Sequence, residues 1–297
     1  MYEDKLSSPL GEKLRAIYKN TISYNFCSWS DLLGFGSTFT KSNWKISDDE
    51  WLKIGLRLDN FYKIYTRNHS STDYMFMLND AIIKVHLINS SKDSFSDIEN
   101  FQILEKISYW FINIVLSHIE ANNEEIYKGL PGVRTIISFG EKIEYTFPDI
   151  KLDDFTLNYA RKNFNDISNV AKYYGNPIII SNPLPLQMNT AFSKSYILDE
   201  IGGSQGLKGN GLYIDESVFE ALLDLIQKTN ILTKEERIIN TEKLVTFKCI
   251  ENNSDTWSFA FLLGPKIQVD NKKLKTNVFK LIKYFPPDED DGFYFEL

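Results

Sequence analysis

The first part of the chain changes from a strand-like to a helix-like pattern of apolar residues. Residues 17–30 are rich in β-branched and aromatic side chains, which predicts a strand that ends at Asp31. Residues 48–66 place apolar side chains three and four positions apart, which predicts an amphipathic helix with Asp48 or Asp49 as its N-cap. A strand and a helix are therefore joined by a short connection.

Two short apolar runs lie close together in the next part of the chain. Tyr74–Leu78 and Ala81–Ile88 are separated only by Asn79 and Asp80. An Asn-Asp pair between two β-rich runs predicts a tight hairpin. The longest helical pattern follows at residues 97–121 and has a broad apolar face.

The second half of the chain continues the mixture of strands and helices, and no stretch has the composition of an interdomain linker. The order of elements predicts an α/β or α+β fold in which helices flank a sheet. We expect residues 1–235 to form the main domain, with residues 236–297 as C-terminal strands and an acidic tail packed on it. We expect strands at 133–143, 177–180, 211–214 and near 243–250 and 256–263, and helices at 154–174, 189–201 and 215–228.

Composition and charge exclude several classes of protein. The 297 residues carry a formal net charge of −7 and the pI is near 5.2, which argues against general binding of polymeric nucleic acid. No apolar run approaches the roughly 18 to 20 residues of a membrane span, and the N-terminus lacks an apolar signal segment. Cys27 and Cys249 are too few and too far apart for a disulfide framework. We therefore expect a cytoplasmic protein that does not bind membranes.

Two aspartates stand where predicted strands end or turn. Asp31 precedes a glycine-rich turn at Gly34–Ser37, and Asp80 lies in the predicted hairpin. Two carboxylates side by side at a sheet edge repel each other unless a cation lies between them, which is the arrangement used in Mg²⁺-dependent phosphate chemistry. The same residues equally fit a bland interpretation, because Asp is favoured as a helix cap and in turns. Only the fold can bring Asp31 and Asp80 together, because they lie far apart in the sequence.

Other chemical signals in the sequence are weak. His69, His86 and His118 lack the spacing of metal ligands, so a satisfied or exposed histidine is the better interpretation of each. The chain contains no Walker-type phosphate loop, no dinucleotide-binding glycine fingerprint and no nucleophile elbow. The glycine-rich stretch at 202–211 follows a predicted helix instead of preceding one, which favours a loop over a phosphate cradle.

Four segments of the chain, taken in order, carry a resemblance to a known family. Trp29–Phe35 has an aspartate at the end of a strand, before an aliphatic pair, Gly and Phe, and Phe76–Ala81 has an aspartate in a strand–turn–strand. Arg134–Glu141 resembles a family strand that reads Arg-Gly-small-Ile-Ser-aromatic-Gly-Glu, and Asn189–Asp199 stands in the place of the catalytic helix. The family is the class III nucleotide cyclases, and the likeness spans roughly residues 20–215.

The resemblance implies an α+β fold, namely a ferredoxin-like class III cyclase homology domain with insertions and a C-terminal extension. Its central, mostly antiparallel sheet would be flanked by helices. It also implies a homodimer in which a nucleoside triphosphate binds at the interface. By this resemblance Asp31 and Asp80 would bind two Mg²⁺ or Mn²⁺ ions, and the carbonyl of Leu32 would assist.

Further residues would bind the substrate according to the same resemblance. The peptide N–H groups of Leu33–Ser37 would face the phosphates, because the two glycines of this turn allow a close approach of the backbone. Phe76 stands where adenylyl and guanylyl cyclases carry a base-reading lysine, which argues against ordinary adenine recognition. The predicted substrate-binding residues are Leu33, Gly34, Phe35, Gly36, Phe76 and Met188.

The predicted catalytic helix also departs from the family. Ser193 and Ile197 stand where the family carries an Asn and an Arg. A cation at the developing phosphoryl charge is an important part of such catalysis, so Arg134, Lys194 or Lys208 would have to replace the missing Arg. The catalytic candidates are Arg134, Ser193 and Lys194. Arg134 equally fits a strand residue paired with a carboxylate, and a lysine such as Lys194 on a helix more often lies on a solvated face.

A divergent branch of the family has a similar altered helix and contains the pyrimidine cyclases of bacterial anti-phage Pycsar systems, which make cyclic UMP or cyclic CMP. This similarity implies a second-messenger synthase that uses UTP or CTP, together with a separate effector that senses the cyclic nucleotide. The alternative is a degenerate cyclase-like domain that binds nucleotide or a partner without turnover, which Ser193 and Ile197 favour. A third interpretation, a structural dimer, requires Asp31 and Asp80 to lie far apart.

Overall fold

The computed structural model describes residues 22–68, 73–88, 97–143, 185–186, 188–227, 232–251, 254–287 and 294–297. The chain divides into two compact units, one formed by residues 1–22 and 143–188 and the other by residues 23–142 and 189–297. Almost all described residues belong to the second unit. The predicted helix at 154–174, the predicted strand at 177–180 and the acidic stretch at 288–291 lie outside the described residues.

The first half of the second unit has the order strand, two helices, two strands, helix and strand. Its elements are β1 (Ile22–Leu32), α3 (Ser37–Lys41), α4 (Asp48–Arg67), β2 (Tyr74–Leu78), β3 (Ala81–Ile88), α5 (Asp97–Tyr127) and β4 (Val133–Ile143). The hairpin and β4 have the predicted bounds, whereas the short helix α3 and the last part of α5 were not expected from the pattern.

The N-terminus of α4 differs from the prediction, because Ser47 is the N-cap in place of Asp48 or Asp49. The Glu50 amide donates to the Ser47 hydroxyl, and the Ser47 amide donates to the Glu50 carboxylate at 2.9 Å. This reciprocal arrangement satisfies two N–H groups, whereas the side chain of a single cap residue satisfies one. The two aspartates lie instead in the first turn, where the helix dipole favours their negative charge.

The second half of the unit contains two helices and the remaining strands. Its elements are α8 (Thr190–Gly202), the 3₁₀ turn η2 (Gly203–Gln205), β5 (Gly211–Asp215), α9 (Glu216–Gln227), β6 (Leu232–Ile239), β7 (Glu242–Glu251), β8 (Ser254–Asp270), β9 (Lys275–Phe285) and β10 (Phe295–Glu296). The predicted helices at 189–201 and 215–228 correspond to α8 and α9. The predicted domain boundary at residue 235 falls inside β6.

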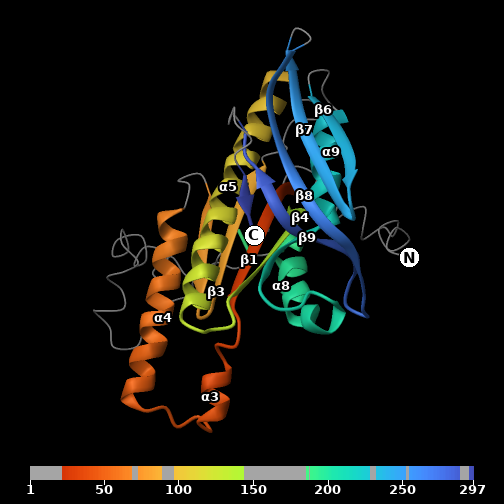
Figure 1. Ribbon diagram of the computed structural model, residues 1–297. Helices are drawn as coiled ribbons and strands as arrows, with labels where there is room; N and C mark the ends of the chain where they lie inside the picture. Colours follow the sequence, from red (N-terminus) through yellow and green to blue (C-terminus); the bar gives the residue numbers. More distant parts are fainter. Residues whose placement is uncertain are drawn as a thin grey trace, which may run out of the picture. The chain divides into compact units, whose positions relative to one another are not determined.

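All of these strands form one ten-stranded sheet in the order β2-β3-β1-β4-β5-β9-β8-β7-β6, with β10 on β9 (Figure 1). The pair of β4 and β5 is parallel. Strands β1 and β4 run antiparallel, because Ser30 contacts Thr135 whereas the earlier Asn25 contacts the later Gly140. The sheet is therefore mostly antiparallel and the fold is α+β, as the sequence predicts.

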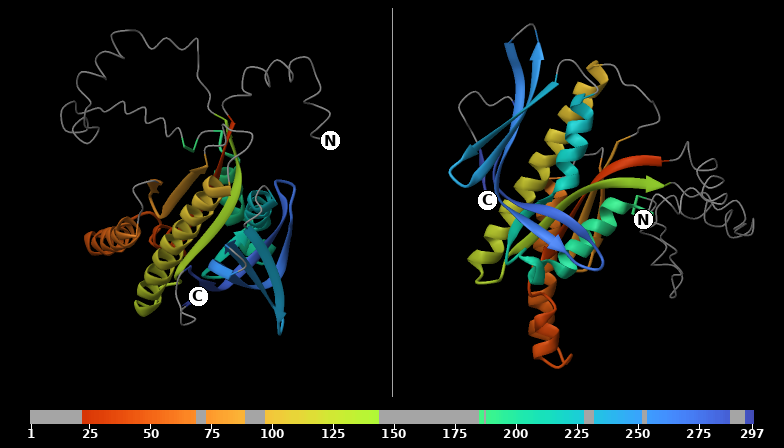
Figure 2. Two further views of the ribbon diagram at one scale, coloured as in Figure 1. Left: turned by 90° about the horizontal axis from the view of Figure 1, so that it is seen from above. Right: turned by 90° about the vertical axis from the view of Figure 1, so that its right-hand side faces the viewer.

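Helices cover both faces of this sheet. The helices α4, α5 and α9 pack on the face that includes Ile137 and Leu212, whereas α8 packs on the face that includes Ile136 and Tyr213. Neighbouring residues of one strand point to opposite faces, which explains why Ile136 and Ile137 belong to different clusters. Figures 1 and 2 show α4 beside α5. No helix in the described part of the chain is long and apolar enough to cross a membrane.

Candidate functional site

Asp31 and Asp80 lie on neighbouring strands at one end of the sheet. Asp31 is the second-last residue of β1, and its Cα lies opposite that of Ala81, the first residue of β3. Asp80 precedes Ala81 in the two-residue turn between β2 and β3. The amide of Leu32 donates a hydrogen bond to the carbonyl of Asp80 at 3.0 Å. The fold thus brings together two residues that are distant in the sequence.

Phe76 lies on the same face of the sheet as Asp31. The strand pairings place Leu78, Ala81 and Asp31 in one row across β2, β3 and β1. Phe76 precedes Leu78 by two residues, so both side chains point to the same face. Phe76 is half-buried and lies opposite Ile83. The predicted base-reading residue and the predicted metal ligand therefore share one surface.

Arg134 reaches this end of the sheet from β4 and is tied to Asp199 of α8. Its Nε donates to Asp199 Oδ1 at 2.7 Å, and its Nη2 donates to the Asp199 carbonyl at 2.9 Å. The side chains are only 11% and 14% exposed, so the ion pair is largely shielded from water. The interpretation of Arg134 as a strand residue paired with a carboxylate describes this arrangement. Asp199 was not among the predicted site residues.

The negative charges at this end of the sheet exceed what the nearby cations neutralise. Burial, followed by the charges of Asp199 and Asp80, raises the pKa of Asp31 to about 7. Arg134 and Arg57 lower it, but by less. Burial likewise raises the pKa of Asp199 even though Arg134 opposes the shift. A further cation would therefore stabilise the ionised form of Asp31.

The glycine-rich turn after β1 uses most of its peptide N–H groups within the protein. Gly34 has a φ of 69°, which glycine adopts without strain. Gly34 and Gly36 are exposed, and no described residue accepts a hydrogen bond from their amides. The N–H groups of Leu33, Phe35 and Ser37 donate to the carbonyls of Gly132, Leu32 and Gly34. Of the peptide N–H groups of Leu33–Ser37 that were predicted to contact phosphate, only those of Gly34 and Gly36 have no acceptor among the described residues.

Leu32 and Phe35 can contribute only backbone groups to a site. Their side chains are 1% and 2% exposed and pack in the hydrophobic cluster beneath α4. The Leu32 carbonyl, predicted as a metal ligand, accepts a hydrogen bond from the Phe35 amide at 3.3 Å. A carbonyl oxygen has two lone pairs, so this bond leaves one acceptor direction for a cation.

Helix α4 donates one hydrogen bond to each of the two turns. Arg57 Nη2 donates to the carbonyl of Leu33 at 3.0 Å, and the Tyr62 hydroxyl donates to the carbonyl of Asn79. Arg57 is held by Glu125 of α5, which accepts from its Nε at 2.9 Å. The side chains of this ion pair are 11% and 6% exposed. The chain segments that follow Asp31 and precede Asp80 are thus bonded to one helix.

The pattern of α4 contains a signal for Arg57 that the predicted site did not use. Arg57 lies at helical spacing between the buried residues Ile54 and Phe61. A cation on the apolar face of a helix requires a buried partner. That partner, Glu125, lies beyond residue 121, where the apolar pattern of α5 weakens, and no local signal connects the two residues.

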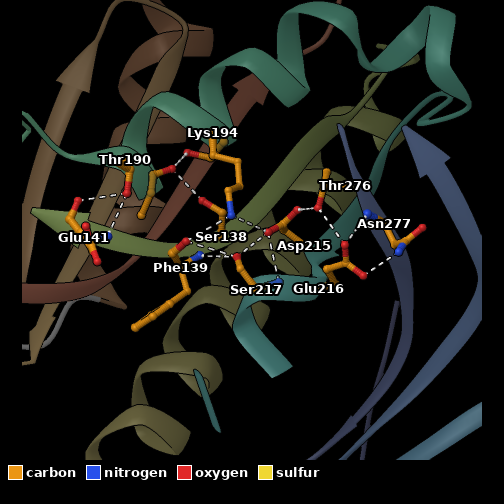
Figure 3. A network of polar contacts seen from close by, with 12 residues as sticks. Ser138, Phe139, Glu141, Thr190, Lys194, Asp215, Glu216, Ser217, Thr276 and Asn277 are labelled. Carbon is orange, nitrogen blue, oxygen red and sulfur yellow. Dashed lines mark hydrogen bonds and ion pairs between the residues drawn. The ribbon is translucent and has the colours of Figure 1, made fainter. Parts of the chain in front are cut away.

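Ser193 and Lys194, the other predicted catalytic residues, lie in the first turns of α8. Lys194 Nζ lies 3.1 Å from Asp215 Oδ1 and donates to the carbonyl of Phe139 at 3.4 Å (Figure 3). The Ser193 hydroxyl donates to the carbonyl of Asn189 at 3.0 Å. Lys194 is therefore an ion-paired residue and does not lie on a freely solvated helix face.

These two residues are distant from the aspartate pair within a single chain. Phe139, which Lys194 contacts, follows Arg134 on β4 by a separation of roughly 16 Å along an extended strand. Asp31 lies near Arg134, because the charge of Arg134 acts on its pKa. The structure thus brings Arg134 to the aspartates and leaves Ser193 and Lys194 elsewhere.

The polar network around Asp215 joins β5, α8, α9 and β9 (Figure 3). Asp215 is fully buried and accepts hydrogen bonds from the Ser217 amide at 3.2 Å and the Thr276 hydroxyl at 2.6 Å. Glu216 accepts from the amide and the side-chain nitrogen of Asn277 at 3.0 and 2.6 Å. These bonds hold the start of α9 against β9, and the lysine of α8 balances the buried charge. The network has the character of a structural anchor.

Met188, the remaining predicted substrate-binding residue, belongs to the first unit. Its side chain is 53% exposed, and its φ of 47° lies in the left-handed region. Its carbonyl accepts a hydrogen bond from the amide of Ile143 at 3.3 Å.

The residues present fit a metal site that the substrate helps to complete. Among the described residues, no group of three or more His, Cys, Asp or Glu side chains could hold a metal ion. Mg²⁺ is usually held by one or two carboxylates, water and substrate phosphates, and does not need an all-protein cage. Asp31 and Asp80 supply two hard oxygen donors, and a bound cation would offset the burial and the neighbouring negative charges that raise the pKa of Asp31.

Comparison with known proteins gives little beyond this geometry. No protein-family model matches the chain, and no curated protein matches it. Among solved structures, the crystal structure of the adenylyl cyclase CyaB from P. aeruginosa matches with a TM-score of 0.36 and 9% sequence identity. The match covers 92% of this chain and 97% of that chain. A likeness this distant assigns neither a family nor an activity to the chain.

Proposed function

We propose that the chain is a metal-dependent nucleotide cyclase that converts a nucleoside triphosphate into its 3′,5′-cyclic monophosphate and pyrophosphate. The observation that carries the proposal is the placement of Asp31 beside Asp80, with the Leu32 amide bonded to the Asp80 carbonyl at 3.0 Å. This placement supports the enzyme over a purely structural dimer, which needs the two aspartates to lie far apart.

The reaction needs few protein groups. The ribose 3′-oxygen forms a bond to the α-phosphorus, the bond from that phosphorus to the β-bridging oxygen breaks, and the hydroxyl proton passes to solvent. Asp31, Asp80 and the Leu32 carbonyl would hold Mg²⁺ or Mn²⁺, which when bound acidifies the hydroxyl and neutralises the phosphates. The exposed amides of Gly34 and Gly36 would donate to phosphate oxygens.

The arrangement of β1 to β4 supports the ferredoxin-like form of the fold. The elements follow one another as strand, helices, strand, strand, helix and strand, and the strands lie in the order β2-β3-β1-β4. The helices of this part pack on one face, which leaves Asp31 and Phe76 on the other. Helix α8 also packs on that face, where Tyr196 contacts Trp29, so a substrate would bind at the end of the sheet that carries the two carboxylates.

The finer parts of the proposal rest on the resemblance of the four sequence segments. Phe76 at the base-reading position argues against ordinary adenine recognition, because it cannot donate a hydrogen bond to the base as a lysine would, and the resemblance to the pyrimidine cyclases then favours UTP or CTP. By the same resemblance, the cyclic nucleotide would activate a separate effector in bacterial defence against phage.

A homodimer would resolve the separation of the predicted catalytic residues. Ser193 is exposed and Lys194 is partly so, and both lie away from Asp31 in their own chain. In a head-to-tail dimer of the kind the resemblance implies, the α8 helix of one protomer would approach the aspartates of its partner. The active sites would then lie at the interface.

The degenerate alternative has one observation in its favour. Arg134 and Arg57, the cations that act on Asp31, are engaged with Asp199 and Glu125 respectively. An arginine in a shielded ion pair is less able to follow the developing charge of a transition state. A chain of this kind would bind nucleotide with Mg²⁺ and release no pyrophosphate.

Product analysis separates these functions. Purified protein is incubated with each of the four nucleoside triphosphates and Mn²⁺, and cyclic products are measured by mass spectrometry. We expect a cyclic pyrimidine nucleotide from wild type and none from Asp31→Asn or Asp80→Asn. The matched control is Asp59→Asn, because Asp59 forms an exposed pair with Lys63 on α4. Equal turnover in wild type and Asp31→Asn, or no turnover of any nucleotide, would contradict the proposal that the chain is a nucleotide cyclase.

A further inference from the structure

One helix, α4, reaches the backbone beside both of the candidate metal carboxylates. Arg57 donates to the carbonyl of Leu33, two residues after Asp31, and Tyr62 donates to the carbonyl of Asn79, directly before Asp80. From these two contacts we infer that α4 is a positioning element that holds the two carboxylates at the spacing a shared cation requires. The inference rests on the proposed metal site.

In the turn after β1, both the N–H and the C=O of Leu33 are hydrogen-bonded. The amide of Leu33 donates to the carbonyl of Gly132 at 3.0 Å, and its carbonyl accepts from Arg57 Nη2 at 3.0 Å. A residue bonded at both its N–H and its C=O cannot rotate its peptide planes without breaking a bond. The preceding carbonyl of Leu32, and the end of β1 that carries Asp31, are thereby held in one orientation.

The second turn is fixed through the peptide that joins Asn79 to Asp80. The Tyr62 hydroxyl bonds to the oxygen of that peptide. Asn79 has a φ of 53°, a left-handed conformation that asparagine tolerates in tight turns. The Tyr62 bond holds this turn directly before the Asp80 carboxylate.

The position of Arg57 is itself determined by α5. Both carboxylate oxygens of Glu125 accept a hydrogen bond from Arg57 Nε, at 3.1 and 2.9 Å. The carbonyl of Leu33 accepts one from Arg57 Nη2. A planar guanidinium can make these bonds together, whereas a lysine ammonium has no fixed fork with which to do so. Arg57 therefore transmits the position of α5 to the turn after Asp31.

Charge alone would give Arg57 the opposite effect on a metal. A buried cation near Asp31 repels a second cation, so the loss of Arg57 without any change of position would strengthen metal binding. Weaker metal binding after loss of Arg57 alone would therefore have the sign expected for lost positioning. Replacing Glu125 as well removes a negative charge and has the opposite electrostatic effect, so the variants that keep the charge, Arg57→Lys and Tyr62→Phe, separate the two explanations.

Mn²⁺ binding to the purified full chain, measured by electron paramagnetic resonance of the free ion, tests the inference. Arg57→Met combined with Glu125→Gln removes the ion pair without leaving a buried charge unpaired, and Tyr62→Phe removes one hydroxyl. Arg57→Lys keeps the charge and removes the fork. We expect each variant to bind Mn²⁺ about 10-fold to 100-fold more weakly than wild type, as is typical when groups that orient metal ligands are lost.

Arg67→Ala is the matched control. Arg67 also pairs α4 with α5, through Glu120 at 2.7 Å, but the side chains are 66% and 40% exposed and touch neither turn. It should bind Mn²⁺ as wild type does.

The outcomes are distinct. If Asp31→Asn abolishes Mn²⁺ binding while Tyr62→Phe and the folded Arg57 variants bind as tightly as wild type or more tightly, the positioning role is wrong and the metal site stands. If the double variant does not fold, Tyr62→Phe and Arg57→Lys decide the question by the same criterion. If wild type and Asp31→Asn bind Mn²⁺ equally, the proposed metal site is wrong and the inference falls with it.

Discussion

The amide of Leu32 and the carbonyl of Asp80 form a hydrogen bond of 3.0 Å where β1 meets the β2–β3 turn. This bond closes the ladder between β1 and β3 directly beside the pairing of Asp31 with Ala81. Because it joins main-chain atoms, side-chain substitutions at Asp31 and Asp80 leave it in place. The carboxylates can therefore be replaced individually while the turn keeps its backbone support.

Asp31→Asn is expected to stabilise the metal-free protein at alkaline pH. The pKa of Asp31 rises from 3.8 to about 7 on folding, so the folded state binds this proton more tightly and wild type loses stability as pH rises from about 4 to about 7. We expect the variant to have a free energy of unfolding ~1–2 kcal/mol higher at pH 8, after allowance for solvent screening, and little changed at pH 4. Urea unfolding with a chelator measures the difference.

A second buried group makes this comparison between variants necessary. Burial lowers the pKa of His118 from 6.5 to about 3, so wild type also loses stability as pH falls below 6.5. The two groups act in opposite directions across the same range, but His118 is present in both proteins and its effect cancels in the difference. A lower unfolding free energy for Asp31→Asn at pH 8 would contradict the burial of an uncompensated carboxylate.

Metal affinity should rise with pH in the same window. A proton and a cation compete for the Asp31 carboxylate, whose pKa is about 7. The ionised fraction increases about tenfold between pH 6 and pH 8, so we expect Mn²⁺ to bind roughly tenfold more tightly at pH 8. Titration of Mn²⁺ at several pH values measures this, and a flat profile would exclude Asp31 as a ligand with a raised pKa.

Gly140→Ala should weaken the docking of α8 on β4. A Cβ at this position would lie 2.3 Å from Thr190 Oγ1 and 2.8 Å from the Ala191 nitrogen, and the backbone cannot yield cheaply. We expect a loss of about 2–4 kcal/mol in the free energy of unfolding. Gly36→Ala is the control, since a Cβ there meets nothing within 4 Å, and its effect should stay within about 0.5 kcal/mol. Denaturant titration of both variants gives the comparison.

Lys194→Met distinguishes a structural from a catalytic lysine. It leaves the fully buried Asp215 without its cation, which should lower the free energy of unfolding by about 2–3 kcal/mol. Adding Asp215→Asn to the same protein should recover part of that loss. Unaltered stability together with abolished turnover would assign Lys194 to catalysis instead.

Elements with one clear local pattern could be predicted from the sequence. The hairpin of β2 and β3 has the predicted bounds, because two apolar runs flank a turn pair, and β4 follows its apolar run in the same way. The strand β6 could not be predicted, because its first half consists of charged residues such as Lys234, Glu235 and Glu236, which pair with each other and with β7. Such a strand forms because β7 offers it an edge to pair with, and the local sequence has no alternation of apolar and polar residues that would predict it.

The candidate site likewise contains residues that could be predicted from the sequence and residues that could not. Asp31 and Asp80 could be singled out because each stands at a strand end or turn within a segment that resembles a metal motif, whereas their positions alone fit a helix cap and a turn residue. Their connection to Arg57 could not, because that contact depends on Glu125 from another helix. Lys194 illustrates the converse. A basic residue in a family-like helix is a reasonable candidate until the fold supplies Asp215 as its partner.

The pairing of β5 with β9 determines how the chain can be shortened. Every residue of β5 is buried, and its two neighbours in the sheet are β4 and β9, which begins at Lys275. A protein ending at residue 235 would lose β9 and leave the hydrogen-bonding edge of β5 open to water and to other chains. Cutting the gene at that point would therefore yield an aggregating fragment, and the strands after residue 235 belong to the smallest version that can be purified.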